Sequence, residues 1–273
     1  MSTSLADHTA VITGAGSGIG RALATHLAHT GCAVVINDIN TSRCNDVART
    51  LSKHGLRAAA CPGDASDIAV IGQMIQVALE RFGRLDLAIA NAGLTPFEDF
   101  FAITPDTFSR IMQVNLHGTF FLAQAAADAM QTSGRGGRIL LMSSVLAEQP
   151  YPGLAPYCMS KAAISMLART LALELAPWNI HVNALAPGAT VTERTIQDDA
   201  RYSEHWAMIT PSGRAASVDE IARIGLFLVS PEASHIRGQT IVVDGGWSNS
   251  GQFPEMLRSP TEMESKSIMD PEA

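Results

Sequence analysis

The stretch Thr9-Ala-Val-Ile-Thr13, followed at once by Gly14-Ala-Gly-Ser-Gly-Ile-Gly20, predicts a β-strand, a tight glycine turn and a helix in succession. Residues 9–13 have the β-rich composition of a short strand, and residues 21–30 have helical composition. Glycines let the backbone turn sharply and approach a phosphate, and the N–H groups at the start of a helix favour negative charge. We therefore predict a pyrophosphate site in this turn, with a purely structural glycine turn as the alternative. Its candidate residues are Gly14, Ser17, Gly18, Ile19 and Gly20.

The next apolar run, Cys32-Ala-Val-Val-Ile-Asn-Asp38, predicts a second buried strand that ends in an acid. An aspartate at this place can accept hydrogen bonds from both hydroxyls of an adenosine ribose and would repel a 2′-phosphate. No lysine or arginine lies within the glycine turn to pair with such a phosphate. Asp38 therefore predicts NAD rather than NADP, unless its carboxylate only caps the following helix.

Strand-like and helical segments alternate along the rest of the chain. Such alternation predicts a doubly wound parallel α/β sheet, the Rossmann fold, with the ligand across the carboxyl ends of the strands. The chain of 273 residues suits one domain, which we place at residues 1–250. Within it, residues 189–216 have the mixed polarity of a lid over the site. Residues 251–273 form a polar tail, either disordered or docked on a neighbouring subunit.

Composition argues against several other functions. The net charge is −7 and no long basic cluster occurs, which argues against a nucleic acid partner. No apolar run reaches the roughly eighteen residues of a membrane span, and the four cysteines form no C-x-x-C pair. We therefore expect a cytoplasmic protein with reduced cysteines. The histidines lack the carboxylate neighbours of a metal site, so no metal is expected.

A second informative stretch is Ser143-Ser-Val-Leu-Ala-Glu-Gln-Pro-Tyr-Pro-Gly-Leu-Ala-Pro-Tyr-Cys-Met-Ser-Lys161. Tyr157 and Lys161 are four residues apart, so on a helix their side chains share one face, as they also do on many solvated helices. A tyrosine acts as a base near neutral pH only if its pKa falls by about three units, or about 4 kcal/mol. A lysine ammonium about 4 Å away can supply that at an effective dielectric near 20. Ser144 ends the preceding apolar run and would bring a hydroxyl to the same place.

Ser144, Tyr157 and Lys161, together with the T-G-x-x-x-G-x-G form of the glycine turn, resemble the short-chain dehydrogenase/reductase family. The resemblance implies that these three residues and Asn115 are catalytic, and that Tyr157 and Lys161 also contact the cofactor. Within the family, Pro150-Tyr-Pro152 resembles the glucose 1-dehydrogenase or 3-oxoacyl-ACP reductase-like branch, although Leu146 replaces a residue that is often polar there. Further cofactor contacts implied by the resemblance are Asp64, Ala65, Asn91, Ala92, Gly93, Pro187, Gly188, Thr190 and Thr192.

Three of these contacts have simpler interpretations. Asp64 can be a turn-forming aspartate, and Thr190 and Thr192 can be ordinary loop threonines. The resemblance also implies a homotetramer in which residues 105–130 and 156–177, both expected to be helical, pair across subunits. The apolar positions of the second helix would equally suit an internal core.

The expected activity is reversible hydride transfer between NAD and a secondary alcohol, or a sugar hydroxyl, and its ketone. Two alternatives are an NADPH-dependent ketone reductase and a catalytically silent dinucleotide-binding scaffold or sensor. An apolar alcohol or ketone is indicated by the large side chains expected at the mouth of the site, which are Leu94, Phe97, Leu146, Tyr151 and Trp206.

Overall fold

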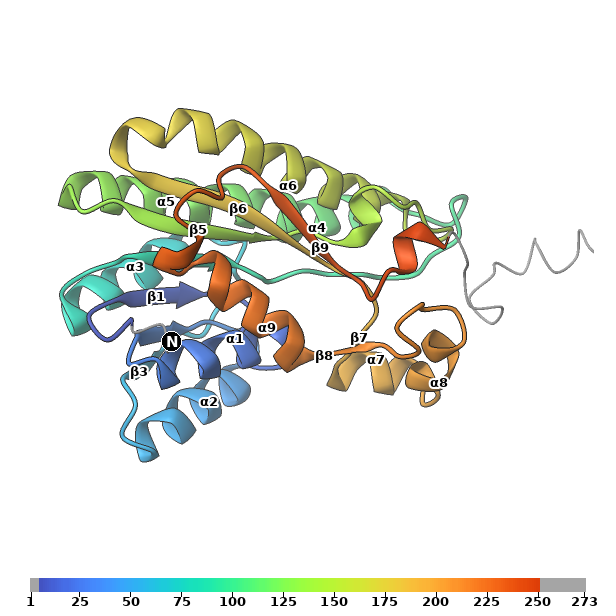
Figure 1. Cartoon of the computed structure of the whole chain (residues 1–273), viewed down its shortest axis with the longest axis horizontal. Helices are drawn as coiled ribbons and strands as arrows, with labels where there is room; N and C mark the ends of the chain where they lie inside the picture. The colour runs from blue at the N-terminus through green and yellow to red at the C-terminus, as the bar shows by residue number, and fades with distance from the viewer. Residues whose placement is uncertain (1–4, 251–273) are drawn as a thin grey trace, which may run out of the picture.

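The computed structural model describes residues 5–250, and its main feature is a seven-stranded parallel sheet (Figure 1). The strand order is β3-β2-β1-β4-β5-β6-β9, and β7 and β8 form a separate parallel pair. The strands are β1 (Thr9–Ile12), β2 (Ala33–Ile36), β3 (Ala58–Ala60), β4 (Leu87–Ala90), β5 (Gly137–Met142), β6 (Ile180–Pro187), β7 (Thr190–Val191), β8 (Ala216–Ser217) and β9 (Thr240–Val243). The predicted tail at 251–273 lies outside the described residues.

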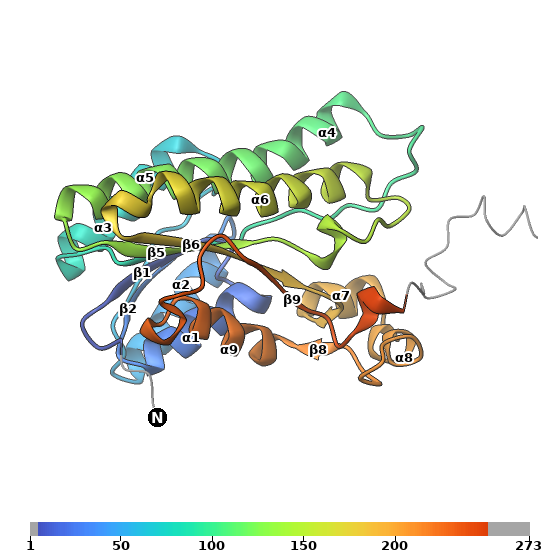
Figure 2. The same ribbon diagram turned by 45° about the horizontal axis from the view of Figure 1, so that its top comes forward.

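Helices cover both faces of the sheet, with α1, α2 and α9 on one side and α3, α5 and α6 on the other (Figure 2). The strands between these layers are buried on both faces, as the fully buried β1, β2 and β4 show. Each large apolar side chain buried in this way contributes roughly 1.5–3 kcal/mol. The helices are α1 (Gly18–His29), α2 (Thr41–Lys53), α3 (Ile68–Phe82), α4 (Pro105–Met112), α5 (Gly118–Ser133), α6 (Ala155–Glu174), α7 (Glu193–Asp198), α8 (Tyr202–Ala207) and α9 (Val218–Leu228).

The topology confirms the predicted doubly wound Rossmann fold in a single domain. From β1 the chain builds β2 and β3 on one side, and then returns to place β4 and the later strands on the other side. The loops after β1 and β4 therefore diverge at the carboxyl edge of the sheet, which is where open α/β sheets bind their ligands.

The long helix expected at residues 105–130 has the interruption that its sequence indicates at residues 113–118. The helices α4 and α5 are joined by a π-helical turn (Gln113–His117), which contains one more residue per turn than an α-helix. The path is otherwise continuous and extends to Ser133, where Gly134 ends it with φ +67°.

Residues 189–216, called the 189–216 segment below, contain β7, α7, α8 and the first residue of β8. These elements lie together at the carboxyl end of the sheet (Figures 1 and 2). The pairing of Thr190 with Ala216 and of Val191 with Ser217 closes the segment at its base.

Within residues 5–250, no helix is both long and apolar enough to cross a bilayer. The same part of the chain contains no cluster of three or more histidine, cysteine, aspartate or glutamate side chains suited to a metal ion.

Candidate active site

A cavity of about 710 Å³ opens at the carboxyl edge of the sheet, between the glycine turn, the start of α6 and the 189–216 segment. It brings together nearly all the residues singled out in the sequence. The predicted residues that line it are Gly14, Ser17, Gly18, Ile19, Asp38, Asp64, Ala65, Asn91, Ala92, Gly93, Ser144, Tyr157, Lys161, Pro187, Gly188, Thr190 and Thr192. Gly20 and Asn115 do not line the cavity. Gly20 packs against Gly14 and Asn91, and Asn115 hydrogen-bonds to Leu94, and these three neighbours do line it.

The glycine turn is shaped as a cradle for a phosphate-sized group. Gly14 and Gly18 have φ of +61° and +53°, which residues with a Cβ adopt only with strain. A Cβ on Gly20 would overlap the Gly14 carbonyl oxygen and lie 2.5 Å from Asn91 Nδ2. Ser17, the N-cap of α1, makes no capping hydrogen bond with its side chain. The turn therefore presents backbone N–H groups and a hydroxyl to the cavity, and these fit a dinucleotide pyrophosphate.

Asp38 lies at the carboxyl end of β2, with 9% of its surface exposed. Its Oδ2 accepts a hydrogen bond from the Gly16 N–H at 3.0 Å, and its Oδ1 accepts one from the Asn40 N–H at 2.8 Å. The side chain that caps α2 is that of Asn40, which accepts from Arg43 N–H at 3.0 Å. The carboxylate of Asp38 is thus fixed between the glycine turn and α2, on the wall of the cavity.

Asn91 ties the end of β4 to the end of β1. Its Nδ2 donates to the carbonyl oxygens of Thr13 and Gly14, at 3.0 and 3.1 Å. The Thr13 hydroxyl accepts hydrogen bonds from the N–H groups of Asn91 and Ala92 at 3.0 and 3.1 Å. Thr13 is the first residue of the T-G-x-x-x-G-x-G pattern but was not among the candidate site residues.

Asp64 is engaged within the protein. One of its carboxylate oxygens lies 2.8 Å from Arg110 Nη2, and the other accepts from the N–H and hydroxyl of Ser66 at 2.9 and 2.7 Å. Burial acts to raise the pKa of Asp64, and the hydrogen bonds from Ser66 and Arg110 outweigh it and lower the pKa. The turn-forming role considered for Asp64 is therefore present, at a position that also lines the cavity.

Ser144, Tyr157 and Lys161 converge on the cavity wall. Ser144 is buried just beyond β5, while Tyr157 and Lys161 share one face of α6. The Lys161 ammonium lies 5.5 Å from the centroid of the Tyr157 ring and donates a hydrogen bond to the Met142 carbonyl oxygen at 2.7 Å. The Lys161 side chain therefore links α6 to the end of β5 and places its ammonium beside the Tyr157 ring.

The electrostatic balance at the phenol differs from the expectation of a large fall in its pKa. Burial raises the pKa of Tyr157, and hydrogen bonding with the side chains of Ser144 and Thr95 lowers it by less. Burial also lowers the pKa of Lys161, to about 8. The groups of this chain alone thus leave the pKa of Tyr157 above its ordinary value, because desolvation outweighs the favourable contacts. Thr95, on the loop after β4, gave no signal in the sequence.

Asn115 is fully buried in the π-helical turn. Its Oδ1 accepts from the Leu94 N–H at 2.7 Å, and its Nδ2 donates to the Leu94 carbonyl at 3.0 Å and to the Ser160 hydroxyl at 3.1 Å. A Cβ on Gly93 would lie 3.5 Å from both Asn115 Oδ1 and Lys161 Nζ. Asn115 therefore holds the backbone after β4 directly beside the lysine.

The loop after β6 carries the last predicted contacts. Gly188 N–H donates to the Val243 carbonyl at 2.9 Å, and a Cβ on Gly188 would lie 2.5 Å from Asp244 Cβ. The Thr190 hydroxyl donates to the Gly188 carbonyl at 3.0 Å, and the Thr192 hydroxyl accepts from the Thr195 N–H at 3.1 Å. Both threonine hydroxyls thus have structural partners within the loop, as in the simpler interpretation, and both residues line the cavity.

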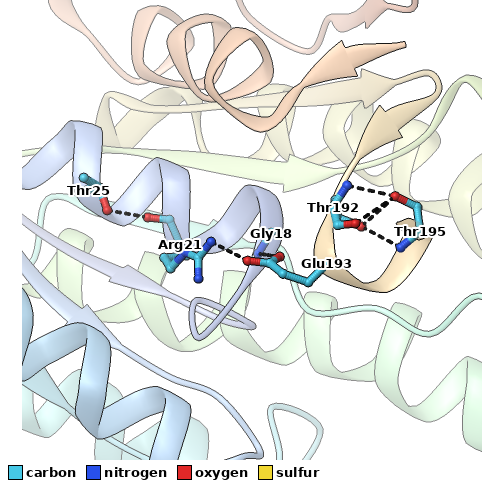
Figure 3. Close-up of polar contacts among 6 residues, drawn as sticks. All are labelled: Gly18, Arg21, Thr25, Thr192, Glu193 and Thr195. Carbon is cyan, nitrogen blue, oxygen red and sulfur yellow. Dashed lines mark hydrogen bonds and ion pairs between the residues drawn. The ribbon is translucent and has the colours of Figure 1, made fainter. Parts of the chain in front are cut away.

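Glu193 and Arg21 form a contact that sequence reasoning missed. Glu193 Oε2 accepts a hydrogen bond from the Gly18 N–H at 3.0 Å, and Glu193 Oε1 forms an ion pair with Arg21 (Figure 3). Burial acts to raise the pKa of Glu193. Hydrogen bonds from the Glu193 and Gly18 N–H groups and the charge of Arg21 outweigh burial, so the pKa is lowered. No spacing rule connects residues 175 positions apart.

A doubly wound parallel sheet with a glycine turn at its ligand-binding edge defines the Rossmann class of dinucleotide-binding folds. A family model described as Enoyl-(Acyl carrier protein) reductase matches residues 14–248. A short-chain dehydrogenase/reductase of Armillaria gallica is 38% identical over 246 residues, covering 87% of this chain and 94% of that protein.

Two solved structures are similar over nearly the whole chain. A gluconate 5-dehydrogenase from Burkholderia cenocepacia J2315, in complex with NADP and tartrate, has a TM-score of 0.83 and 37% identity, covering 90% of this chain and 97% of that chain. A 7α-hydroxysteroid dehydrogenase, complexed with NADH and 7-oxo glycochenodeoxycholic acid, has a TM-score of 0.83 and 34% identity, covering 89% and 95%. The chain therefore belongs to the short-chain dehydrogenase/reductase family of oxidoreductases.

Proposed function

We propose that this protein is an NAD-dependent dehydrogenase that interconverts a secondary alcohol and its ketone by reversible hydride transfer. The observation that carries the proposal is the convergence of Ser144, Tyr157 and Lys161 on the cavity that the glycine turn and Asp38 also line. A dinucleotide bound there supplies the hydride acceptor, and the protein supplies distance, orientation and charge.

Four side chains take part in the proposed proton transfer. In the oxidative direction, the Tyr157 phenolate accepts the proton of the substrate hydroxyl, while Ser144 hydrogen-bonds the same oxygen and orients it. The pKa of Tyr157 is raised by burial, so its phenolate would need the Lys161 ammonium, 5.5 Å from the ring centroid, together with the positive charge of a bound oxidised nicotinamide. Asn115 is fully buried and holds the backbone of Leu94 and the Ser160 hydroxyl next to this lysine, where a water would carry the proton onward.

Asp38 supports the choice of NAD over NADP. Its fixed carboxylate would hydrogen-bond the ribose hydroxyls and repel a 2′-phosphate. The two solved relatives do not decide the choice, because one holds NADP and the other NADH. We expect kcat/KM to be at least tenfold higher with NAD than with NADP. The same measurement on Asp38→Ala should remove most of the difference, and a preference for NADP by the unmodified protein would instead identify an NADPH-dependent ketone reductase.

The substrate end of the cavity supports an apolar alcohol or ketone. Leu94, Phe97, Leu146, Tyr151 and Trp206 all line it, and the Phe97 and Tyr151 rings pack edge to face with centroids 5.8 Å apart. A panel of cyclic and aryl carbinols, steroids and sugars, followed by NADH absorbance, tests this. Turnover of sugars alone would contradict the apolar assignment, and no turnover of any alcohol would favour a scaffold or sensor.

A homotetramer is proposed for the assembly. The outer face of α6 leaves Met159, Met166 and Leu173 exposed at 56%, 57% and 80%, which suits helix pairing with a second copy of the chain. Light scattering that gives four times the chain mass of 28.9 kDa would support it.

A further inference from the structure

The Glu193 carboxylate lies on a backbone donor of the glycine turn. Gly18 is the first residue of α1, and its N–H points to the cavity edge, where it donates to Glu193 Oε2 at 3.0 Å (Figure 3). N–H groups at a helix start bind anions because they have no intrahelical partner and carry the positive end of the helix dipole. Glu193 therefore satisfies, from within the chain, a donor of the kind that a pyrophosphate would use.

The start of α7 fixes Glu193 in this position. Thr192 caps α7 reciprocally with Thr195, so that Glu193 is the first helical residue, and Thr192 Cγ2 would lie 3.5 Å from a Cβ on Gly18. An acid at a helix start is stabilised by that helix's own dipole, which makes the placement doubly favourable. The 189–216 segment thus contacts the glycine turn at one defined point.

Arg21 offers the same carboxylate a second partner. Its guanidinium pairs with Glu193 Oε1, and its carbonyl accepts from the Thr25 hydroxyl at 2.8 Å, one turn further along α1 (Figure 3). The two carboxylate oxygens therefore have different partners, one a backbone N–H at the cavity edge and the other a cation beside it.

We propose that Glu193 is a positioning residue that competes with the pyrophosphate of the dinucleotide for the Gly18 N–H, and that dinucleotide binding shifts its carboxylate wholly onto Arg21. The inference rests on the proposed function, because it takes a nicotinamide dinucleotide as the ligand. It makes the 189–216 segment a lid whose contact with the glycine turn loosens as the dinucleotide binds.

The first test measures the Kd of NADH and of ADP-ribose by fluorescence and calorimetric titration of Glu193→Gln. ADP-ribose contains the pyrophosphate without the nicotinamide, so it isolates the proposed competition. A neutral amide accepts the Gly18 N–H less strongly and does not repel phosphate, so both ligands should bind about fivefold more tightly. The matched control is Glu204→Gln, because Glu204 forms a similar exposed pair with Arg201 in the same segment but does not line the cavity.

Unchanged or weaker binding of ADP-ribose by Glu193→Gln overturns the competition and leaves Glu193 as a fixed support of α7. If the unmodified protein bound neither NADH nor ADP-ribose, the proposed function itself would be wrong. Should Glu193→Gln fail to fold, Glu193→Asp serves instead, since the shorter carboxylate withdraws from Gly18 and should also tighten binding.

A second test separates the two partners of Glu193. Arg21→Gln removes the cation that receives the carboxylate, so it should weaken ADP-ribose binding about fivefold in the normal background and much less in Glu193→Gln. Equal weakening in both backgrounds would show that Arg21 acts independently of Glu193, and would overturn the transfer of the carboxylate between them.

Discussion

The glycine turn and the 189–216 segment face the same cavity but are held in place differently. Around the turn, buried strands, the Asn91 amide and the Thr13 hydroxyl fix the backbone through short hydrogen bonds. In the segment, the fixed points are helix caps, exposed ion pairs and an edge-to-face contact of Trp206 with Trp247 at 5.1 Å. The comparison teaches that one wall of this site is buried backbone held by hydrogen bonds between distant parts of the chain, and the other consists of short helices held mainly by side-chain contacts between near neighbours.

The largest expected effect tests whether both walls serve one reaction. Tyr157→Phe removes the proposed proton acceptor and should lower kcat about 10³-fold, in the range of general acid–base catalysis. The Kd of NADH, measured by fluorescence titration, should change less than threefold because the ring remains. Retained turnover would end the proposed mechanism.

The next largest effect is expected from Lys161→Met, on the free energy of unfolding. Burial lowers the pKa of Lys161 from 10.5 to about 8, so below about pH 8 the native state carries a buried charge. Between about pH 8 and 10.5 the unfolded chain binds the extra proton, and stability rises with pH by up to about 3 kcal/mol. Lys161→Met should therefore be the more stable protein at pH 7, by an amount that shrinks toward pH 10. Urea unfolding at pH 7, 8, 9 and 10 measures it, and a difference independent of pH contradicts the assignment.

Within the backbone-built wall, Gly20→Ala should destabilise the protein by about 2 kcal/mol and weaken NADH binding, because the new methyl group has no space beside Gly14 and Asn91. The matched control is Gly72→Ala in α3, where nothing lies within 4 Å of the new Cβ. Removing that helical glycine should stabilise the protein by about 0.5–1 kcal/mol. Denaturant unfolding compares the two, and equal effects would contradict the close packing of the turn.

The smallest effect is expected in the side-chain wall. Arg201→Ala breaks the exposed pair with Glu204, whose side chains are 68% and 66% exposed, and should change the free energy of unfolding by less than about 0.5 kcal/mol. A loss as large as that of Gly20→Ala would show that surface pairs hold the segment as firmly as the backbone holds the turn.

The separation of interacting residues along the chain explains how much could be predicted from the sequence. The succession of β1, the glycine turn and α1, the strand ending at Asp38, and the shared helix face of Tyr157 and Lys161 are local patterns, and the fold built on them is confirmed. No local sequence pattern predicts the ion pair of Asp64 with Arg110 or the hydrogen bond from Gly18 to Glu193, because these residues are 46 and 175 positions apart. The rise in the pKa of Tyr157 was also missed, because it depends on how deeply the folded protein desolvates the ring.

The π-helical turn at Gln113–His117 has a consequence for the length of the chain in this region. In a regular α-helix one extra residue would rotate everything after it by about 100° around the axis, whereas the wider π-helical turn absorbs that residue. Removing one residue from the turn would therefore give a regular helix in which Leu122 and Ala126 still face the sheet, but it would displace Asn115 from Leu94. The extra residue thus lets one helix pack on the sheet through Leu122 and Ala126 and hold the loop after β4 through Asn115.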